Sequence, residues 1–276
     1  YNALMATMKN DGSQISKYSP LEGRRQPGEE QCGMHINCCN ANGPRGFALI
    51  PKTACTIKDN HIYLNLYLPL QATISLNKKN KVHLNVESDY PIHGKVNVNI
   101  GVQKKEKFTL ALRIPTQIEK MKAYINGEEQ EITHKGGYLY IERIWENADK
   151  VTLDFKIETK VVKLNNSQAI VRGPLLFARD SRFNDGDIDE CATIKCNNQG
   201  VIQAKIKKNK TGTFPWITLT VPAVLGTDLE NVENKTPKLI NFCDFSSSGN
   251  DWNPNGRYRV WIPQTFHAMS EPYKKY

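Results

Sequence analysis

Two adjacent cysteines, Cys38 and Cys39, are the residues of this chain whose types and spacing most clearly suggest chemistry. Neighbouring thiolates can ligate one soft metal ion, and Zn²⁺ binds cysteine sulfur at about 2.3 Å in structural and catalytic sites. Metal ligation, or a position at a helix N-terminus, also lowers a thiol pKa below its usual ~8.5 and creates a nucleophile at neutral pH. Cys32 and His35 lie just upstream and could add ligands, although this spacing is not a standard zinc pattern. The pair alone favours the alternative of two buried thiols that act as small apolar residues.

Two further groups of residues have types that could bind a ligand. The acidic run NDGDIDE at 184–190 resembles part of a calcium loop, but it lacks a bidentate Glu at the required offset, which favours a solvated acidic turn. The four tryptophans could stack on sugars, although Trp145 and Trp261 lie in strand-like runs typical of core residues. The sequence contains no phosphate-binding glycine loop, no G-x-S-x-G motif and no H-E-x-x-H motif.

Composition excludes several classes of protein. The net charge is +9, from 37 Lys and Arg against 28 Asp and Glu, which raises the question of nucleic acid. The basic residues occur as Lys-Lys pairs in turn-like places, without a basic helix or a finger spacing, so we expect a solvated surface and no nucleic-acid partner. No apolar run approaches the ~20 residues that span a bilayer, and seven cysteines, an odd number, argue against a closed disulfide framework.

The elements that must position the cysteine pair begin with helical patterns. Residues 1–9 have a short helical pattern that ends in an Asn-Asp-Gly turn, and a long polar loop follows. From about residue 38 to residue 50 the pattern again allows a helix, with Pro44 near its first turn and Phe47, Ala48 and Ile50 on an apolar face. The cysteine pair would then begin this helix.

From about residue 60 the pattern has a period of two, which is typical of strands with one wet face in antiparallel sheets. Asn126-Gly127 and Gly136-Gly137 have the composition of hairpin turns. After about residue 165 the strands continue less regularly, with two short strands hinged at Gly173-Pro174. The sequence therefore predicts a mainly β chain with two antiparallel sandwich domains. The alternating runs are HIYLNLYL, KVHLNVE, KVNVNIGV, KFTLALRI and KVTLDFKI.

Several of these motifs together resemble glycoside hydrolase family 127, the β-L-arabinofuranosidase family. The resemblance starts at CCNANGPRGFALIP, which YSPLEG precedes and HIYLNLYLP follows. It covers nearly the whole chain and is weakest over 180–255. The later matching segments are SDYPIHGKVNVNI, FTLALRIP, INGEE, GGYLYIERIWENADKVTLDF, AIVRGPLLFARD and RVWIP.

The resemblance implies an (α/α)₆ barrel followed by β-sandwich domains. Residues 1–58 would be the C-terminal end of the barrel, 59–165 the first sandwich and 166–276 the second. The chain begins with Tyr1 and has no signal peptide, so we interpret it as the C-terminal part of a longer protein. A bacterial periplasmic or cytoplasmic location, and a homodimer formed through the β domains, are further expectations.

The resemblance also implies a chemistry. Similar proteins hydrolyse glycosides with retention, using a cysteine nucleophile on a zinc ion that three Cys and one Glu hold. Carried over, Cys38 is the nucleophile and a zinc ligand, Cys39 is a zinc ligand, and Tyr18 contacts the plant-glycan substrate. The other ligands and the Glu general acid/base would precede residue 1. The alternative is a non-catalytic β-sandwich module that binds carbohydrate or serves as a scaffold, with inert cysteines.

Overall fold

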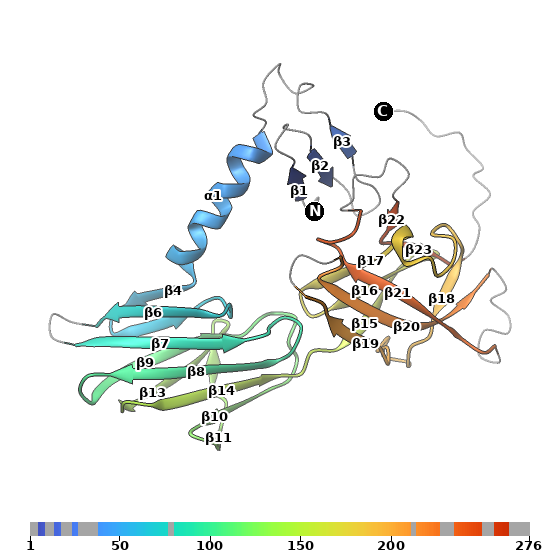
Figure 1. Cartoon of the computed structure of the whole chain (residues 1–276). Coiled ribbons are helices and arrows are strands. Elements are labelled where there is room, and N and C mark those ends of the chain that lie inside the picture. Colours follow the sequence, from blue (N-terminus) through green and yellow to red (C-terminus); the bar gives the residue numbers. More distant parts are fainter. Residues whose placement is uncertain are drawn as a thin grey trace. The chain divides into compact units, whose positions relative to one another are not determined.

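The computed structural model describes residues 5–8, 14–17, 24–26, 38–76, 80–210, 214–226, 235–249 and 257–264, with side chains from residue 45 onward. The chain divides into two compact units, one of residues 38–157 and one of residues 1–37 with 158–276 (Figure 1). The predicted mainly β fold with antiparallel sheets is confirmed. The division lies between Ile157 and Glu158, earlier than the predicted boundary after residue 165, because the strand that follows pairs along its length with its successor in the second unit.

The unit of residues 38–157 contains one helix and two sheets. The helix is α1 (Cys38–Thr53), which covers and extends the predicted helix. A six-stranded sheet has the order β11-β10-β14-β8-β7-β6, and a five-stranded sheet has the order β12-β13-β9-β5-β4. The strands are β4 (Cys55–Lys58), β5 (His61–Leu64), β6 (Leu70–Ser75), β7 (Lys81–Ser88), β8 (Lys95–Val102), β9 (Glu106–Arg113), β10 (Met121–Ile125), β11 (Glu128–Gln130), β12 (His134–Lys135), β13 (Tyr138–Trp145) and β14 (Asp149–Phe155).

The core of this unit lies between the two sheets. One cluster of buried side chains draws members from both sheets, and the alternation along β8 matches the predicted period of two. Trp145 is fully buried as predicted, stacks on Phe108 and donates its indole N–H to the Phe108 carbonyl at 3.0 Å. The bond satisfies the only polar atom of a large apolar side chain, so the tryptophan can occupy the core without a desolvation penalty.

Two tight turns confirm the sequence prediction. Asn126-Gly127 connects the paired residues Ile125 and Glu128, with φ angles of 51° and 92°. Gly136-Gly137 connects Lys135 and Tyr138 in the same way, with φ angles of 59° and 79°. Positive φ at both central positions is the condition for a turn that matches the twist of a hairpin, which is why Asn and Gly occupy them.

One expectation about local structure is wrong, and one strand pairing was not anticipated. Met5–Met8 forms the strand β1, not part of a helix, and pairs with β2 (Gln14–Lys17), which pairs in turn with β3 (Arg24–Gln26). A helical pattern of nine residues is too short to be stable by itself, so strand pairing prevails. Strands β5 and β9 run parallel, because the chain between them passes through β6, β7 and β8 of the other sheet and returns in the same direction.

The second unit is built around one branched sheet of nine strands. The order β15-β16-β17-β21-β20-β18 forms its path, with β19 on β20, β22 on β17 and β23 on β16. The predicted hinge at Gly173-Pro174 is confirmed as the turn between β16 and β17. The strands are β15 (Thr159–Leu164), β16 (Ser167–Arg172), β17 (Leu175–Asp180), β18 (Ala192–Ile194), β19 (Lys205–Lys208), β20 (Ile217–Leu225), β21 (Lys238–Asp244), β22 (Tyr258–Arg259) and β23 (Ile262–Pro263).

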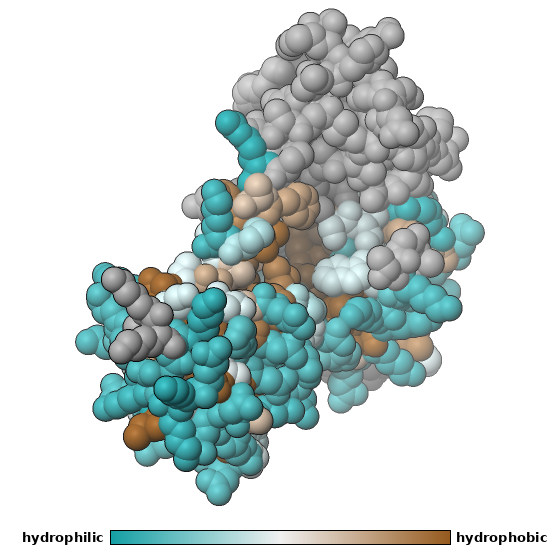
Figure 2. Space-filling view, turned by 60° about the vertical axis from the view of Figure 1, so that its left-hand side comes forward, coloured by the Kyte–Doolittle hydropathy of each residue, from teal (hydrophilic) through white to brown (hydrophobic). Residues whose placement is uncertain are grey.

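Figure 2 shows a face that is mainly hydrophilic over the described residues, with apolar side chains exposed in places. Within the described ranges, none of the helices has the length and apolarity needed to cross a membrane.

Candidate active site

The predicted nucleophile and its neighbour begin α1. Cys38 and Cys39 are the first two residues of this 16-residue helix, and their side chains lie outside the part of the chain whose side chains are described. The first N–H groups of a helix have no partner within it and carry the positive end of the helix dipole. A thiol in this position is more easily deprotonated, which is the property a cysteine nucleophile or zinc ligand needs. Tyr18, Cys32 and His35 lie outside the described residues.

The other end of α1 is fixed to the sandwich through Asn65. The Asn65 backbone N–H donates to the Ala54 carbonyl at 2.8 Å, and its side-chain amide donates to the Thr53 carbonyl at 2.8 Å and to Thr56 Oγ1 at 3.2 Å. The Tyr138 hydroxyl donates to Asn65 Oδ1 at 2.7 Å. Asn65 therefore ties the last turn of the helix to two strands. The sequence pattern did not reveal this role, because Asn65 occupies an ordinary polar position in an alternating run.

The apolar face predicted for α1 is only partly covered. Phe47 is 74% exposed and Leu49 is 55% exposed, whereas Ile50 is half-buried. A helix in a folded protein normally packs its large apolar side chains against another element. Two large apolar side chains of α1 are therefore exposed in the described part of the chain.

The thiols of Cys38 and Cys39 are suitable donors for zinc, which prefers sulfur and nitrogen ligands in a tetrahedral arrangement. They would supply two of its ligands. Within the described ranges, no group of three or more His, Cys, Asp and Glu side chains is placed to hold a metal ion. The remaining ligands would have to come from elsewhere, as the resemblance implies.

The other cysteines with described side chains have a different character. Burial raises the pKa of the Cys55 thiol to about 11, and burial is also the main cause that raises the pKa of Cys191. Cys243 is fully buried and donates its thiol to the Ala178 carbonyl, with a sulfur–oxygen distance of 3.6 Å. The raised pKa values of Cys55 and Cys191 disfavour their thiolate forms, and the burial of Cys243 indicates a role in packing.

The acidic run is an ion-paired turn and not a calcium loop. Arg179 is 2% exposed, and its Nη2 lies 3.3 Å from Asp185 Oδ1. The two oxygens of Asp189 lie 2.6 Å from the guanidinium of Arg257 and 3.0 Å from that of Arg259. The carboxylates of Asp185 and Asp189 thus neutralise arginines of the same unit, which is more specific than the solvated turn expected from the sequence.

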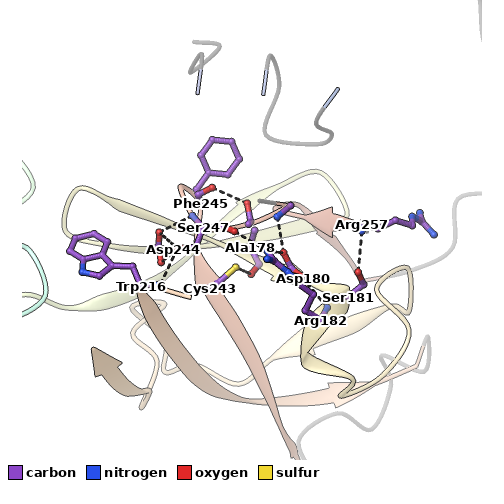
Figure 3. Close-up of polar contacts among 12 residues, drawn as sticks. Ala178, Asp180, Ser181, Arg182, Trp216, Cys243, Asp244, Phe245, Ser247 and Arg257 are labelled. Carbon is purple, nitrogen blue, oxygen red and sulfur yellow. Dashed lines mark hydrogen bonds and ion pairs between the residues drawn. The ribbon is translucent and has the colours of Figure 1, made fainter. Parts of the chain in front are cut away.

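Two buried carboxylates in the second unit, Asp180 and Asp244, form the polar network of Figure 3. Asp180 accepts hydrogen bonds from the backbone N–H of Arg182 at 3.0 Å, from its guanidinium at 2.7 and 2.8 Å, and from the Gly249 N–H at 2.7 Å. Asp244 accepts from the Ile217 N–H at 2.9 Å and from Ser247 through both its N–H and its hydroxyl. These two carboxylates accept hydrogen bonds from backbone and side-chain donors of the surrounding loops, and they thereby fix those loops.

We expect Asp244→Asn to destabilise the second unit by about 2 kcal/mol. The amide N–H₂ would replace a carboxylate oxygen and face a backbone N–H, so two buried donors would lack an acceptor. The measurement is chemical denaturation of the 276-residue chain. Asp189→Asn is the matched control: its side chain is 37% exposed, and the change should stay within about 0.5 kcal/mol. Equal midpoints for the two variants would show that the Asp244 network does not stabilise the unit.

The tryptophans divide into core and surface residues. Trp145 is in the core, and Trp261 is partly buried against the small core cluster of the second unit. Trp216 is 38% exposed, and its backbone N–H donates to Ser247 Oγ at 3.0 Å. Trp252 lies outside the described residues.

Comparison with known proteins found a similar domain and similar folds. Residues 61–157 match the family model for the β-L-arabinofuranosidase GH127 middle domain. A search of the curated proteins found no match. The chain resembles the crystal structure of a GH127 β-L-arabinofuranosidase from Geobacillus stearothermophilus, with 22% identity and a TM-score of 0.66 over 89% of this chain and 39% of that one.

Two further solved structures give the same result. A protein described as a glycoside hydrolase has 24% identity and a TM-score of 0.69 over 88% of this chain and 41% of that one. The GH127 β-arabinofuranosidase BT3674 has 21% identity and a TM-score of 0.67 over 91% and 42%. The chain therefore spans about two fifths of the structures that it matches. The resemblance predicted from the motifs is confirmed, in sequence over the middle domain and in fold over most of the chain.

Proposed function

We propose that this chain is the C-terminal part of a retaining, zinc-dependent glycoside hydrolase that releases β-L-arabinofuranose or a related plant-glycan sugar. The observation that carries the proposal is a conjunction: a helix that begins with two adjacent cysteines, followed by the short strand β4, precedes the segment that matches the GH127 middle domain. Cys38 is the proposed nucleophile and Cys39 the proposed pure metal ligand.

The proposed reaction has two displacements. The Cys38 thiolate attacks the anomeric carbon, the glycosidic C–O bond breaks, and the leaving oxygen takes a proton from a Glu that we expect upstream of residue 1. Water then attacks the same carbon, gives its proton back to that Glu, and the C–S bond breaks to restore the thiolate. Two inversions at one carbon give retention of configuration.

The proposed roles of the chain's own residues follow from their position. The free N–H groups at the start of α1 favour the thiolate form of both cysteines. Zinc bound by Cys38 and Cys39 would lower the thiol pKa values further and make the sulfur a better leaving group. Adjacent ligands suit this chemistry, because one thiolate can stay in place as a ligand while its neighbour turns toward the sugar.

The test uses the full-length protein that contains this chain. We expect about one tightly bound zinc ion per chain, hydrolysis of an aryl β-L-arabinofuranoside, and loss of both after treatment with a chelator. The 276-residue chain alone should be inactive, because the proposed acid/base is not part of it. A full-length protein that binds glycans but contains no zinc and hydrolyses no aryl arabinofuranoside would favour the non-catalytic module instead.

A further inference from the structure

A pocket of about 500 Å³ opens on the outer face of the five-stranded sheet, beside the last turn of α1. We name it the Tyr63–Arg113 pocket; its lining includes Thr56, Lys58, Tyr63, Asn65, Arg113 and Tyr138. All of these residues belong to the unit of residues 38–157. They come from strands β4, β5, β9 and β13 and from the residue that follows β5, so elements distant in the sequence build one pocket.

The strand register explains why these side chains gather. Tyr63 lies opposite Thr56 on one side and Ala111 on the other, while Arg113 lies opposite Tyr138. Ala111 is small and its side chain points to the outer face of the sheet, but the residue is fully buried. Tyrosine rings on the strands to either side cover it, so β9 forms a floor with aromatic walls.

The walls of the pocket are held in place by contacts within the unit. The rings of Tyr63 and Tyr138 pack edge to face with centroids 5.4 Å apart. The Tyr138 hydroxyl donates to Asn65, whose amide is in turn bound to the helix end and to Thr56. The Arg113 carbonyl accepts a hydrogen bond from the buried Tyr67 hydroxyl at 2.5 Å, which fixes the end of β9. A ligand would therefore meet a largely preorganised surface.

The charged side chains that line the pocket are all positive. Its lining contains two cations, Lys58 and Arg113, and no carboxylate. Within the described residues neither cation forms an ion pair, whereas Lys107, on the same strand and the same face as Arg113, lies 2.6 Å from Glu142. Two cations without a carboxylate in a lining of phenol, amide and hydroxyl groups are complementary to an anion that also carries hydroxyls.

We propose that the Tyr63–Arg113 pocket binds a carboxylated saccharide, such as a uronate residue of an acidic glycan. The Arg113 guanidinium and the Lys58 ammonium bind the carboxylate, the rings of Tyr63 and Tyr138 pack against the C–H face of the sugar, and Thr56 bonds its hydroxyls. The aromatic walls favour a sugar over a bare anion, and the cations favour an acidic sugar over a neutral one.

The experiment is calorimetric titration of the 276-residue chain with trigalacturonate, its carboxyl-reduced neutral form, and acetate. We expect trigalacturonate to bind at least ~10-fold more tightly than either of the others, because a charge-assisted hydrogen bond contributes that much or more. Arg113→Gln should weaken trigalacturonate binding by ~10-fold, and added salt should weaken it further. Lys107→Gln, which removes a cation already paired with Glu142, should leave the affinity unchanged.

Three outcomes would overturn the proposal. Equal affinity for the acidic and neutral trisaccharides, or binding of neither, would remove the acidic sugar as ligand. Acetate binding as tightly as trigalacturonate would reduce the pocket to a simple anion site. If Arg113→Gln left both the melting temperature and the affinity unchanged, any binding would occur at another site. Since the assay measures binding and not turnover, its result does not depend on the proposed role of Cys38.

Discussion

Cys38→Ser is expected to lower the turnover of the full-length protein by ~10³-fold or more while the fold stays intact. A serine hydroxyl is not ionised at neutral pH, whereas a helix N-terminus, where Cys38 lies, favours the thiolate form of a cysteine. In the proposed mechanism the substitution therefore removes the attacking atom and leaves the helix unchanged. The measurement is the turnover of an aryl β-L-arabinofuranoside, with the melting temperature as a check on the fold.

Cys39→Ser is the matched variant, because it makes the same chemical change one residue along the helix. It should lower zinc affinity first and activity as a consequence, since it removes a ligand and not the nucleophile. Added zinc should then restore part of the activity of Cys39→Ser and none of the activity of Cys38→Ser. Equal behaviour of the two variants would contradict the division of roles.

A mechanism-based inhibitor that traps the sugar on its nucleophile should mark Cys38 and spare Cys39. Peptide mass mapping of the labelled protein locates the modification. Cys55 is an internal control, because burial raises the pKa of its thiol to about 11 and keeps it protonated at neutral pH. A label on a carboxylate, or near-normal activity of Cys38→Ser, would show that the cysteine is not the nucleophile.

Gly94→Ala is expected to destabilise the unit of residues 38–157 by about 3 kcal/mol or more. A Cβ atom at Gly94 would lie 1.8 Å from the carbonyl oxygen of Phe155 and 2.8 Å from its carbonyl carbon. The Phe155 N–H also donates to the Gly94 carbonyl at 3.0 Å, so the two backbones cannot separate without losing this bond. Phe155 is buried against Tyr67 and Tyr90, and any shift would disturb the core.

Gly101→Ala provides the control, because Gly101 lies in β8, the strand that Gly94 precedes. Its added Cβ would lie 3.4 Å from the nearest atom, His83 Cβ, which is ordinary van der Waals contact. We expect a change within about 1 kcal/mol. Hydrogen exchange of the β7, β8 and β14 amides reports on this unit alone. Similar protection in the two variants would show that the backbone at Gly94 has room to move.

The sequence was sufficient wherever local chemistry decides the structure. The alternating runs predicted the strands, Asn126-Gly127 predicted its turn because that turn requires positive φ, and Trp145 was assigned to the core because of its strand position. In each of these cases a few neighbouring residues contain the physical cause.

The errors and omissions concern partners that are distant in the sequence. Met5–Met8 has a helical pattern, and only its pairing with β2 makes it a strand. The parallel pairing of β5 with β9 joins residues about fifty positions apart, which no local pattern encodes. Asn65 is polar, like many outward strand residues, and its role at the end of α1 depends on where the helix ends in space. The same applies to Arg113, because the residues that line a pocket with it come from α1, β4, β5 and β13.

Because Asn65 anchors one end of α1, a small tilt of the helix moves its other end by a larger distance. At a rise of ~1.5 Å per residue, the cysteine pair lies roughly 22 Å along the axis from the fixed end. A tilt of only ~3° at Thr53 would therefore displace the pair by about 1 Å, a misplacement that can cost an enzyme ~10²-fold in rate. The proposed reaction at the far end of the helix therefore depends on how rigidly the Asn65 amide contacts hold the helix angle. If a substitution in the sandwich lowers the rate, the cause would then be a changed tilt of α1 and not the loss of a contact with substrate.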